Sequence, residues 1–389
     1  MEKIRIGDAC DILNGFAFKS DKYVEGGIRV IRIANVQKGY IEDDAPVFYP
    51  ADYAGLEKYM LEEGDLLMSL TGNVGRVGIL QKEMLPAALN QRVACLRLKT
   101  ECITKGFLFH VLNSVFFEQQ CVYTSNGVAQ KNMSTEWLKD YEIPLYPIKE
   151  QLKITEVLDR IRCVINLRNV ELRRLDDLIK ARFVELFGDP ANNEKGFIKA
   201  PMGDYMTLLT DFSSNGSYKT LDSGVTMYDE PNYAWMVRTT DLESGDMTSI
   251  KYIDESAYAL LSKSKIYGGE IIMNKIGSAG KIYLMPQINM PASLGRNAFM
   301  FRYDERINVK FLYHLLTSDY GKREIQQYVR GAVTKTITKN DARAVLIIVP
   351  PIELQNEFEV FVEQVDKSKL MFQKLHQKLN ILRQKAGNI

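Results

Sequence analysis

Apolar positions along the chain follow two different periods. Short apolar runs next to glycines, such as LLMSL (66–70) and IIMN (271–274), predict buried strands. Two long stretches instead place apolar residues at alternating steps of three and four, which is the heptad-like period of a helix that packs along one side. Each helical stretch follows a mixed α/β region, so the pattern predicts a mixed region and a long helix, repeated once.

The two predicted helices have clear sequence signals at their ends. Pro147 and Pro351 stand just before them, and Gly188 and Gly387 follow them. Each helix holds about 35 residues and is about 50 Å long, so a lone helix would leave a long apolar seam unpacked. We expect the two helices to form an antiparallel coiled coil; two unrelated surface helices are the alternative. The predicted seam residues are Ile154, Leu158, Ile161, Ile165, Leu172, Leu175, Ile179, Phe358, Phe361, Val365, Phe372, Leu375, Leu379 and Leu382.

One unit occurs twice in the sequence. GDLLMSLTGNVGRV (64–77) aligns with GEIIMNKIGSAGKI (269–282) at an offset of 205, and FLFHVLNS (107–114) aligns with FLYHLLTS (311–318). Such a duplication predicts two mixed α+β domains, related by a pseudo-twofold axis if the long helices run antiparallel. The predicted boundaries are a first domain at 1–148, a first long helix at 149–187, a linker at 188–200, a second domain at 201–352 and a second long helix at 353–389.

The repeated glycine stretch does not match a known phosphate-binding loop. A P-loop requires a Gly-Lys-Ser/Thr end, whereas Gly75 is followed by Arg76 and Val77. A dinucleotide fingerprint requires G-x-G-x-x-G at the start of a helix, and the spacing here is G-x-x-G-x-x-G. The stretch therefore predicts a β-hairpin closed by a glycine turn.

Composition and missing motifs exclude several classes of protein. No run approaches the ~20 apolar residues of a membrane span. The five cysteines form no C-x-x-C pair and predict free thiols in the cytoplasm. Methyltransferase, hydrolase, kinase and zinc-protease signatures are absent, and three histidines offer little for a metal site. A duplicated chain without such motifs is typical of a recognition protein rather than a catalyst, with no metal or cofactor of its own.

The chain resembles the specificity subunits of type I restriction-modification systems over essentially its whole length. The resemblance rests on the hairpin, ALNQRVACLR (88–97), NGVAQKNMS (126–134), the run IPLYPIKEQ (143–151) into the first long helix, and ARFVELFGDPANN (181–193) at its end. The second copy departs in SLGRNAFMFR (293–302), which replaces ALNQRVACLR.

The resemblance implies a DNA-recognition role for the chain. Each mixed domain would be a target recognition domain that reads one half of a bipartite, asymmetric site in double-stranded DNA. The coiled coil would set the spacer between the halves and dock two modification subunits. Those subunits would carry S-adenosylmethionine, and restriction subunits would use ATP and Mg2+. This chain would catalyse no reaction itself.

Cations and amides near the repeated motifs are the candidate DNA contacts, because Arg, Lys, Asn and Gln distinguish base edges in the major groove. A net charge of +1 means that binding depends on local clusters or on partner subunits. For each residue, a solvated surface charge is the alternative. The candidates are Arg32, Asn73, Arg76, Arg92, Gln130, Lys131, Arg238, Lys275, Ser278, Lys281, Arg296 and Lys335.

Two other functions compete with this hypothesis. A coiled-coil scaffold without sequence-specific DNA binding would show no preference for any DNA sequence in the presence of a methyltransferase partner. A self-contained enzyme with an unrecognised site would turn over a substrate without partners.

Overall fold

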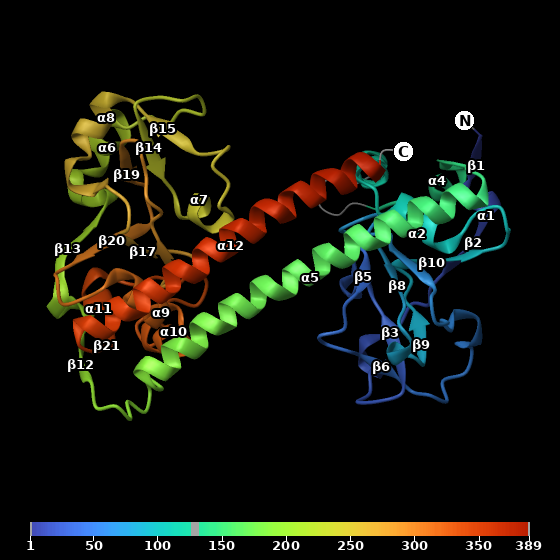
Figure 1. Ribbon diagram of the computed structural model, residues 1–389, viewed down its shortest axis with the longest axis horizontal. Coiled ribbons are helices and arrows are strands. Elements are labelled where there is room, and N and C mark those ends of the chain that lie inside the picture. The colour runs from blue at the N-terminus through green and yellow to red at the C-terminus, as the bar shows by residue number, and fades with distance from the viewer. Residues whose placement is uncertain (1, 126–131, 388–389) are drawn as a thin grey trace. The chain divides into compact units, whose positions relative to one another are not determined.

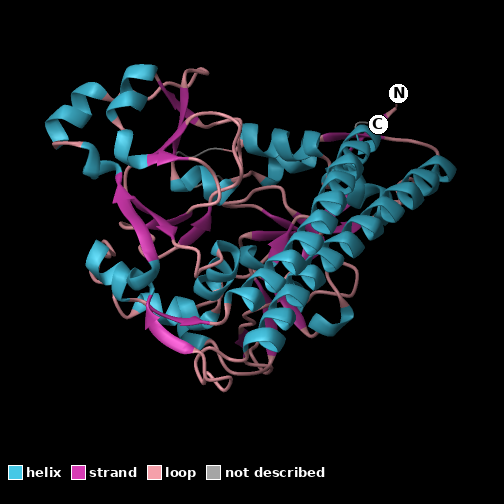
Figure 2. Ribbon diagram, turned by 60° about the vertical axis from the view of Figure 1, so that its left-hand side comes forward, coloured by secondary structure: helices cyan, strands magenta, loops and turns pink. Residues whose placement is uncertain are grey.

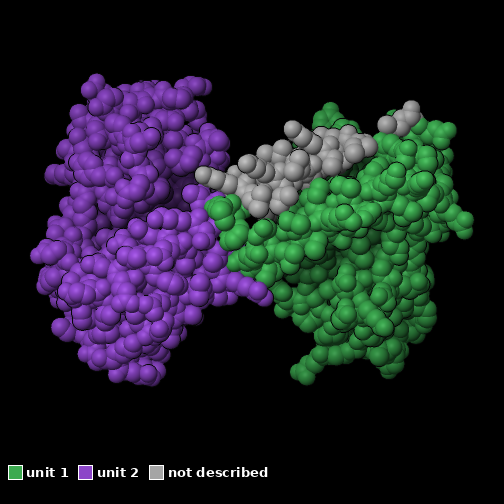
Figure 3. Space-filling view, in the orientation of Figure 1, with its two compact units in different colours: residues 1–171, 371–389 green, residues 172–370 purple. Residues whose placement is uncertain are grey.

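The computed structural model describes residues 2–125 and 132–387, with side chains as far as Phe372. The chain divides into two compact units (Figure 3): unit 1 holds residues 1–171 and 371–389, and unit 2 holds residues 172–370. Each unit contains a mixed α/β domain and parts of both long helices, α5 (Ile148–Phe187) and α12 (Ile352–Gly387), which are labelled in Figure 1.

Both units contain a four-stranded antiparallel sheet with the same strand order. In unit 1 the order is β2 (Cys10–Asn14), β10 (Val93–Leu98), β7 (Leu66–Ser69) and β8 (Val77–Ile79). In unit 2 it is β13 (Met206–Asp211), β20 (Ala298–Tyr303), β17 (Ile271–Asn274) and β18 (Ile282–Leu284). The predicted hairpin is confirmed in both copies, and its register repeats: Met68 faces Val77, as Met273 faces Ile282.

Two smaller sheets also recur. The first holds β6 (Phe48–Tyr49), β3 (Ile28–Ile31) and β9 (Ala87–Leu89) in unit 1. In unit 2 it holds β15 (Lys251–Ile253), β14 (Ala234–Val237), β19 (Ala292–Leu294) and β16 (Lys265–Ile266). The second pairs β1 (Lys3–Arg5) with β11 (Glu142–Pro144), and β12 (Ile198–Pro201) with β21 (Leu346–Val349). The duplication inferred from the sequence is therefore present in the topology.

The shorter helices surround these sheets, as Figure 2 shows in cyan. In unit 1 they are α1 (Ile6–Ala9), α2 (Lys105–Leu112), α3 (Val115–Thr124) and α4 (Thr135–Asp140). In unit 2 they are α6 (Tyr218–Gly224), α7 (Thr239–Ser244), α8 (Glu255–Leu260), α9 (Val309–Thr317), α10 (Asp319–Gln326) and α11 (Lys339–Ala344). In place of α7, unit 1 has a small hairpin of β4 (Val36–Gln37) and β5 (Tyr40–Ile41).

The four-stranded sheet is covered on both faces, which explains its uninterrupted apolar runs. In unit 2, Met273 and Phe301 pack with α9, α10 and the long helices, while Ile272 and Met300 pack against Trp235 of the neighbouring sheet. Every residue of β7 and of β17 is buried. The short apolar runs thus belong to strands inside a three-layered domain.

The long helices pack antiparallel, as predicted. Within unit 2, Asp176 pairs with Lys369 at 2.7 Å, and the Phe183 and Phe358 rings lie 5.5 Å apart. Residue numbers therefore increase along α5 in the direction in which they decrease along α12. The predicted seam residues as far as Phe372 are buried or half-buried, whereas the side chains of Leu375, Leu379 and Leu382 lie outside the described part. No helix among the described residues is long and apolar enough to cross a membrane.

Candidate nucleic-acid interface

The repeated glycine turn joins β7 to β8 in unit 1 and β17 to β18 in unit 2. Gly75 and Gly280 have φ values of +77° and +85°, which favour glycine. A Cβ on Gly75 would lie 2.7 Å from the Cys121 Sγ, and a Cβ on Gly280 would lie 2.4 Å from the Ile325 Cγ2. The glycines thus serve a tight turn that packs on a helix, on α3 in unit 1 and on α10 in unit 2. The candidates Asn73 and Ser278 are exposed in these turns.

The basic residue after each turn reaches the same place in both units. The Arg76 Nη1 donates a hydrogen bond to the Gln37 Oε1 at 2.6 Å. The Lys281 Nζ donates to the Glu243 Oε1 at 2.5 Å, and hydrogen bonds from Lys281 and then Tyr283 lower the pKa of the Glu243 carboxyl. Gln37 and Glu243 both lie in the segment that follows the first strand of the smaller sheet.

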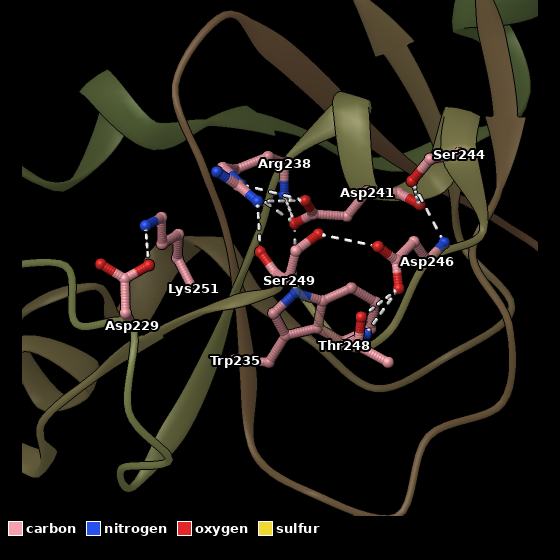
Figure 4. Close-up of polar contacts among 9 residues, drawn as sticks. All are labelled: Asp229, Trp235, Arg238, Asp241, Ser244, Asp246, Thr248, Ser249 and Lys251. Carbon is pink, nitrogen blue, oxygen red and sulfur yellow. Dashed lines mark hydrogen bonds and ion pairs between the residues drawn. The ribbon is translucent and has the colours of Figure 1, made fainter. Parts of the chain in front are cut away.

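A second recurrent arginine holds the two ends of that segment. The Arg32 Nη2 donates to the Ala45 carbonyl oxygen at 2.9 Å, and the Arg238 Nη2 donates to the Ser249 carbonyl oxygen at 2.9 Å. In unit 2, the Asp241 carboxylate anchors Arg238, with a distance of 3.0 Å between the Arg238 Nε and the Asp241 Oδ1 (Figure 4). We call residues 33–45 and 239–249 the clamped segments.

The clamped segments share anchor points but differ in structure. The segment of unit 1 contains the β4–β5 hairpin, and that of unit 2 contains α7. In unit 2 the Asp246 carboxylate accepts hydrogen bonds from the Thr248 backbone N–H and hydroxyl, at 2.8 and 2.7 Å, and from the Ser249 hydroxyl (Figure 4). The hydrogen bonds from Thr248 are the main cause of the lowered pKa of Asp246. Corresponding supports therefore present two chemically different surfaces.

Two more candidates in unit 2 make contacts within the protein. The Lys275 Nζ lies 2.9 Å from the Asp211 Oδ2, and the Lys339 Nζ lies 2.8 Å from the Oδ1 of the same carboxylate. Burial would raise the pKa of Asp211, but hydrogen bonds from Lys339, Ser214 and Lys275 hold it well below its usual range. Arg296 pairs with an aspartate of α6 and lies 4.9 Å from the centre of the Phe212 ring.

The remaining candidates are exposed or lie outside the described residues. Arg92 is exposed just before β10. Gln130 and Lys131 fall outside the described residues. Ser278, Lys281 and Lys335 line one hollow of about 720 Å³ in unit 2. The structure thus brings these three together, and it connects Arg32 with Arg76 through the clamped segment of unit 1.

Sequence reasoning missed a pair of buried glutamines at the start of the long helices. Gln151 of α5 and Gln355 of α12 are each 0 % exposed. The Gln151 Oε1 accepts from the Thr104 N–H at 2.7 Å, and its Nε2 donates to the Cys102 and Tyr146 carbonyls, both at 2.8 Å. Gln355 makes the equivalent contacts in unit 2. The recurrence of PIKEQ (147–151) as PIELQ (351–355) was the available signal.

The two matched histidines also contact the long helices. The His110 Nε2 lies 3.0 Å from the Asp159 Oδ1 on α5. His314 packs edge-on against the Phe358 ring, with 5.3 Å between the ring centres, and burial lowers the pKa of His314 to about 4. The described residues contain no group of three or more side chains that could hold a metal ion.

Replacing Arg238 with alanine is expected to lower the free energy of unfolding of unit 2 by about 2–3 kcal/mol. The change removes the cation that pairs with the buried Asp241 carboxylate, and hydrogen bonds to charged groups contribute about 1.5–3 kcal/mol. Thermal unfolding and limited proteolysis within 239–249 would measure the effect. Arg296→Ala is the control, because exposed ion pairs contribute about 0–1 kcal/mol. Equal stability and equal cleavage of the two variants would show that Arg238 does not hold the segment.

Comparison with known proteins identifies the class of domain. Residues 1–176 match the family model of the type I restriction modification DNA specificity domain. Over 385 residues, the chain is 25% identical to the EcoBI specificity subunit of Escherichia coli, covering 93% of this chain and 78% of that protein. Over 188 residues it is 31% identical to the MjaVIII specificity subunit of Methanocaldococcus jannaschii, covering 46% of this chain and 43% of that protein.

Solved structures share the fold over the full length. The S subunit of a type I restriction-modification system from M. genitalium aligns with a TM-score of 0.54 and 15% identity, covering 99% of this chain and 94% of that chain. A chain from a study of complex assembly in a type I system aligns with a TM-score of 0.53 and 18% identity, covering 100% of this chain and 96% of that chain. Residues 1–176 thus match the DNA specificity domain of type I restriction-modification systems, the whole chain is similar to specificity subunits of such systems, and the scaffold alternative is not favoured.

Proposed function

We propose that this chain recognises DNA sequence for a type I restriction-modification complex, and that each mixed domain reads one half of a bipartite, asymmetric target. The observation that carries the proposal is the duplicated fold with different clamped segments. Two copies of one scaffold present a hairpin in one case and a helix in the other. Different surfaces on one framework suit two half-sites of different sequence, because base edges distinguish sequence and phosphate contacts only position the protein.

The long helices have a separate part in the proposal. Their antiparallel coiled coil sets the spacer between the half-sites and docks two modification subunits. Two arginines on the seam support the rigidity of this element: Arg168 lies 5.0 Å from the centre of the Phe372 ring in unit 1, and Arg182 lies 5.7 Å from that of Phe361 in unit 2. Guanidinium stacking of this kind fixes the register of the packed helices without a gap in the seam.

Catalysis belongs to the partners in this proposal. The modification subunits hold S-adenosylmethionine, the restriction subunits use ATP and Mg2+, and the complex works in the cytoplasm. The chain itself catalyses nothing and holds no cofactor. The candidate contacts with DNA are Asn73, Arg92, Ser278 and Lys335, which are exposed, together with Gln130 and Lys131. Arg32, Arg76, Arg238, Lys275, Lys281 and Arg296 act mainly by holding the surfaces that meet DNA.

Exchanging residues 1–148 for those of a related specificity subunit is expected to change one half of the methylated motif and to leave the other half and the spacer intact. The reason is that each mixed domain has its own sheets and core. Sequencing of methylated DNA from cells that carry the hybrid and its modification subunits would report the motif. The matched control exchanges residues 201–352 and should change only the other half. A change in both halves from either exchange would contradict the proposal.

A further inference from the structure

The hollow beside the glycine turn of unit 2 has basic walls. Its lining includes Lys281, Lys322 and Lys335, and it includes no aspartate or glutamate. Lys281 is bonded to Glu243, as described above. Among the described residues, the side chains of Lys322 and Lys335 have no ion pair or hydrogen bond, and both are exposed. The ammonium groups of Lys322 and Lys335 therefore line one concave surface without an ion pair among the described residues, whereas other candidate cations of this domain are paired.

The helix under the turn explains why the hollow is basic in this unit. Gly75 packs on Cys121 of α3 and Gly280 packs on Ile325 of α10, so the two helices correspond at an offset of 204. At that offset, the position of Lys322 is occupied in unit 1 by Glu118. The Glu118 carboxylate pairs with the Lys38 ammonium.

The neighbouring positions differ in the same direction. Arg323 and Gln326 of α10 correspond to Gln119 and Val122 of α3. Val122 is 40% exposed, so this face of α3 is partly apolar. Among the described residues, the face that carries basic and amide side chains in unit 2 carries an acidic, an amide and an apolar one in unit 1. The two domains therefore differ in charge where the turn meets the helix.

We propose that the hollow of unit 2 binds the sugar–phosphate backbone of DNA beside the half-site that this unit reads, with Lys322 and Lys335 as the phosphate contacts. The inference rests on the proposed function of the chain. Lysine is a flexible point charge, which suits a phosphate oxygen and carries no base preference. The volume of about 720 Å³ exceeds what a single small anion fills.

The proposal makes the two domains unequal in how they hold DNA. In B-DNA, log K falls as log salt concentration rises, and each neutralised phosphate steepens this fall by about 0.9 in the magnitude of the slope. Unit 2 then supplies up to two such contacts from this hollow. Lys322 has the acidic Glu118 as its counterpart in unit 1, whereas the counterpart of Lys335 is Lys131, which lies outside the described residues.

The test uses the chain assembled with its modification subunits and measures affinity for target DNA over a range of salt concentrations. For the double variant Lys322→Ala/Lys335→Ala, the magnitude of the slope should decrease by about 1–2, while the methylated motif stays unchanged. Non-target DNA should show the same fall. Lys263→Ala, which removes another exposed lysine of unit 2 outside the hollow, is the control and should leave the slope within error of the wild type.

Three results would overturn the inference. An unchanged slope in the double variant would show that Lys322 and Lys335 do not contact phosphates. An altered motif would mean that the lysines read bases. The third result is a variant that unfolds at the wild-type temperature but no longer assembles with the modification subunits. That result would show that the hollow is a protein interface. These outcomes differ from a failure of the proposed function, in which the wild-type complex itself prefers no DNA sequence and both proposals fall.

Discussion

Replacing Gln355 with leucine is expected to lower the free energy of unfolding of unit 2 by about 2–4 kcal/mol. Gln355 is 0 % exposed at the start of α12. Its Oε1 accepts from the Asn308 N–H at 2.8 Å, and its Nε2 donates to the Pro350 and Arg306 carbonyls at 2.8 and 3.1 Å. Leucine leaves these backbone groups without a partner, and each unsatisfied buried group costs about 1–3 kcal/mol.

Urea denaturation, followed by hydrogen exchange of unit 2 amides, would measure this loss. The same substitution at Gln364, an exposed position of the same helix, is the matched control and should change stability by less than about 0.5 kcal/mol. Gln151→Leu should reproduce the effect in unit 1. If Gln355→Leu and Gln364→Leu unfold at the same urea concentration, the buried amide does not fasten α12 to its domain.

Replacing Phe187 with alanine should destabilise unit 2 by about 3–5 kcal/mol, the usual range for a large aromatic residue in a core. Phe187 ends α5 and is 0 % exposed. Its ring centre lies 4.7 Å from that of Phe311, 4.9 Å from that of Phe183 and 5.6 Å from that of Phe358. The ring thus joins α5, α9 and α12, and its loss leaves a cavity where the three helices meet.

Hydrogen exchange would locate the effect of this change. Protection should fall in α9, in α12 as far as residue 370 and in the last turns of α5, while the β2–β10–β7–β8 sheet of unit 1 keeps its protection. Val184→Ala is the control, because Val184 lies one turn earlier in α5 and is 58% exposed. A uniform loss of protection in both units would mean that the aromatic cluster does not define a separate core.

The elements that the sequence predicted well are those with local signals. The hairpin followed from an apolar run, a glycine turn and a second run within fifteen residues, and its repetition at the same offset gave independent support. The coiled coil followed from a seam over many turns. Such patterns depend on backbone geometry and burial, which act over a few residues and leave a periodic trace.

The roles of the candidate cations depended on partners that leave no such trace. Arg238 was selected because its counterpart in the first unit is Arg32. Arg238 donates to the Ser249 carbonyl and Arg32 to the Ala45 carbonyl, and a main-chain acceptor cannot be predicted from the type of residue that carries it. Recurrence of a charge identifies a repeated environment and does not distinguish a support from a ligand contact. The buried glutamines show another limit, because the sequence shows that Gln151 and Gln355 recur but not that the fold encloses them.

The anchoring of the clamped segments has a consequence for how such a chain changes over generations. Ala45 and Ser249 are held through their backbone oxygens, which every amino acid possesses. Mutations at these two positions therefore leave the accepting oxygens in place, whatever side chains they introduce. After a duplication, the two copies are free to drift toward separate ligands at little cost in stability.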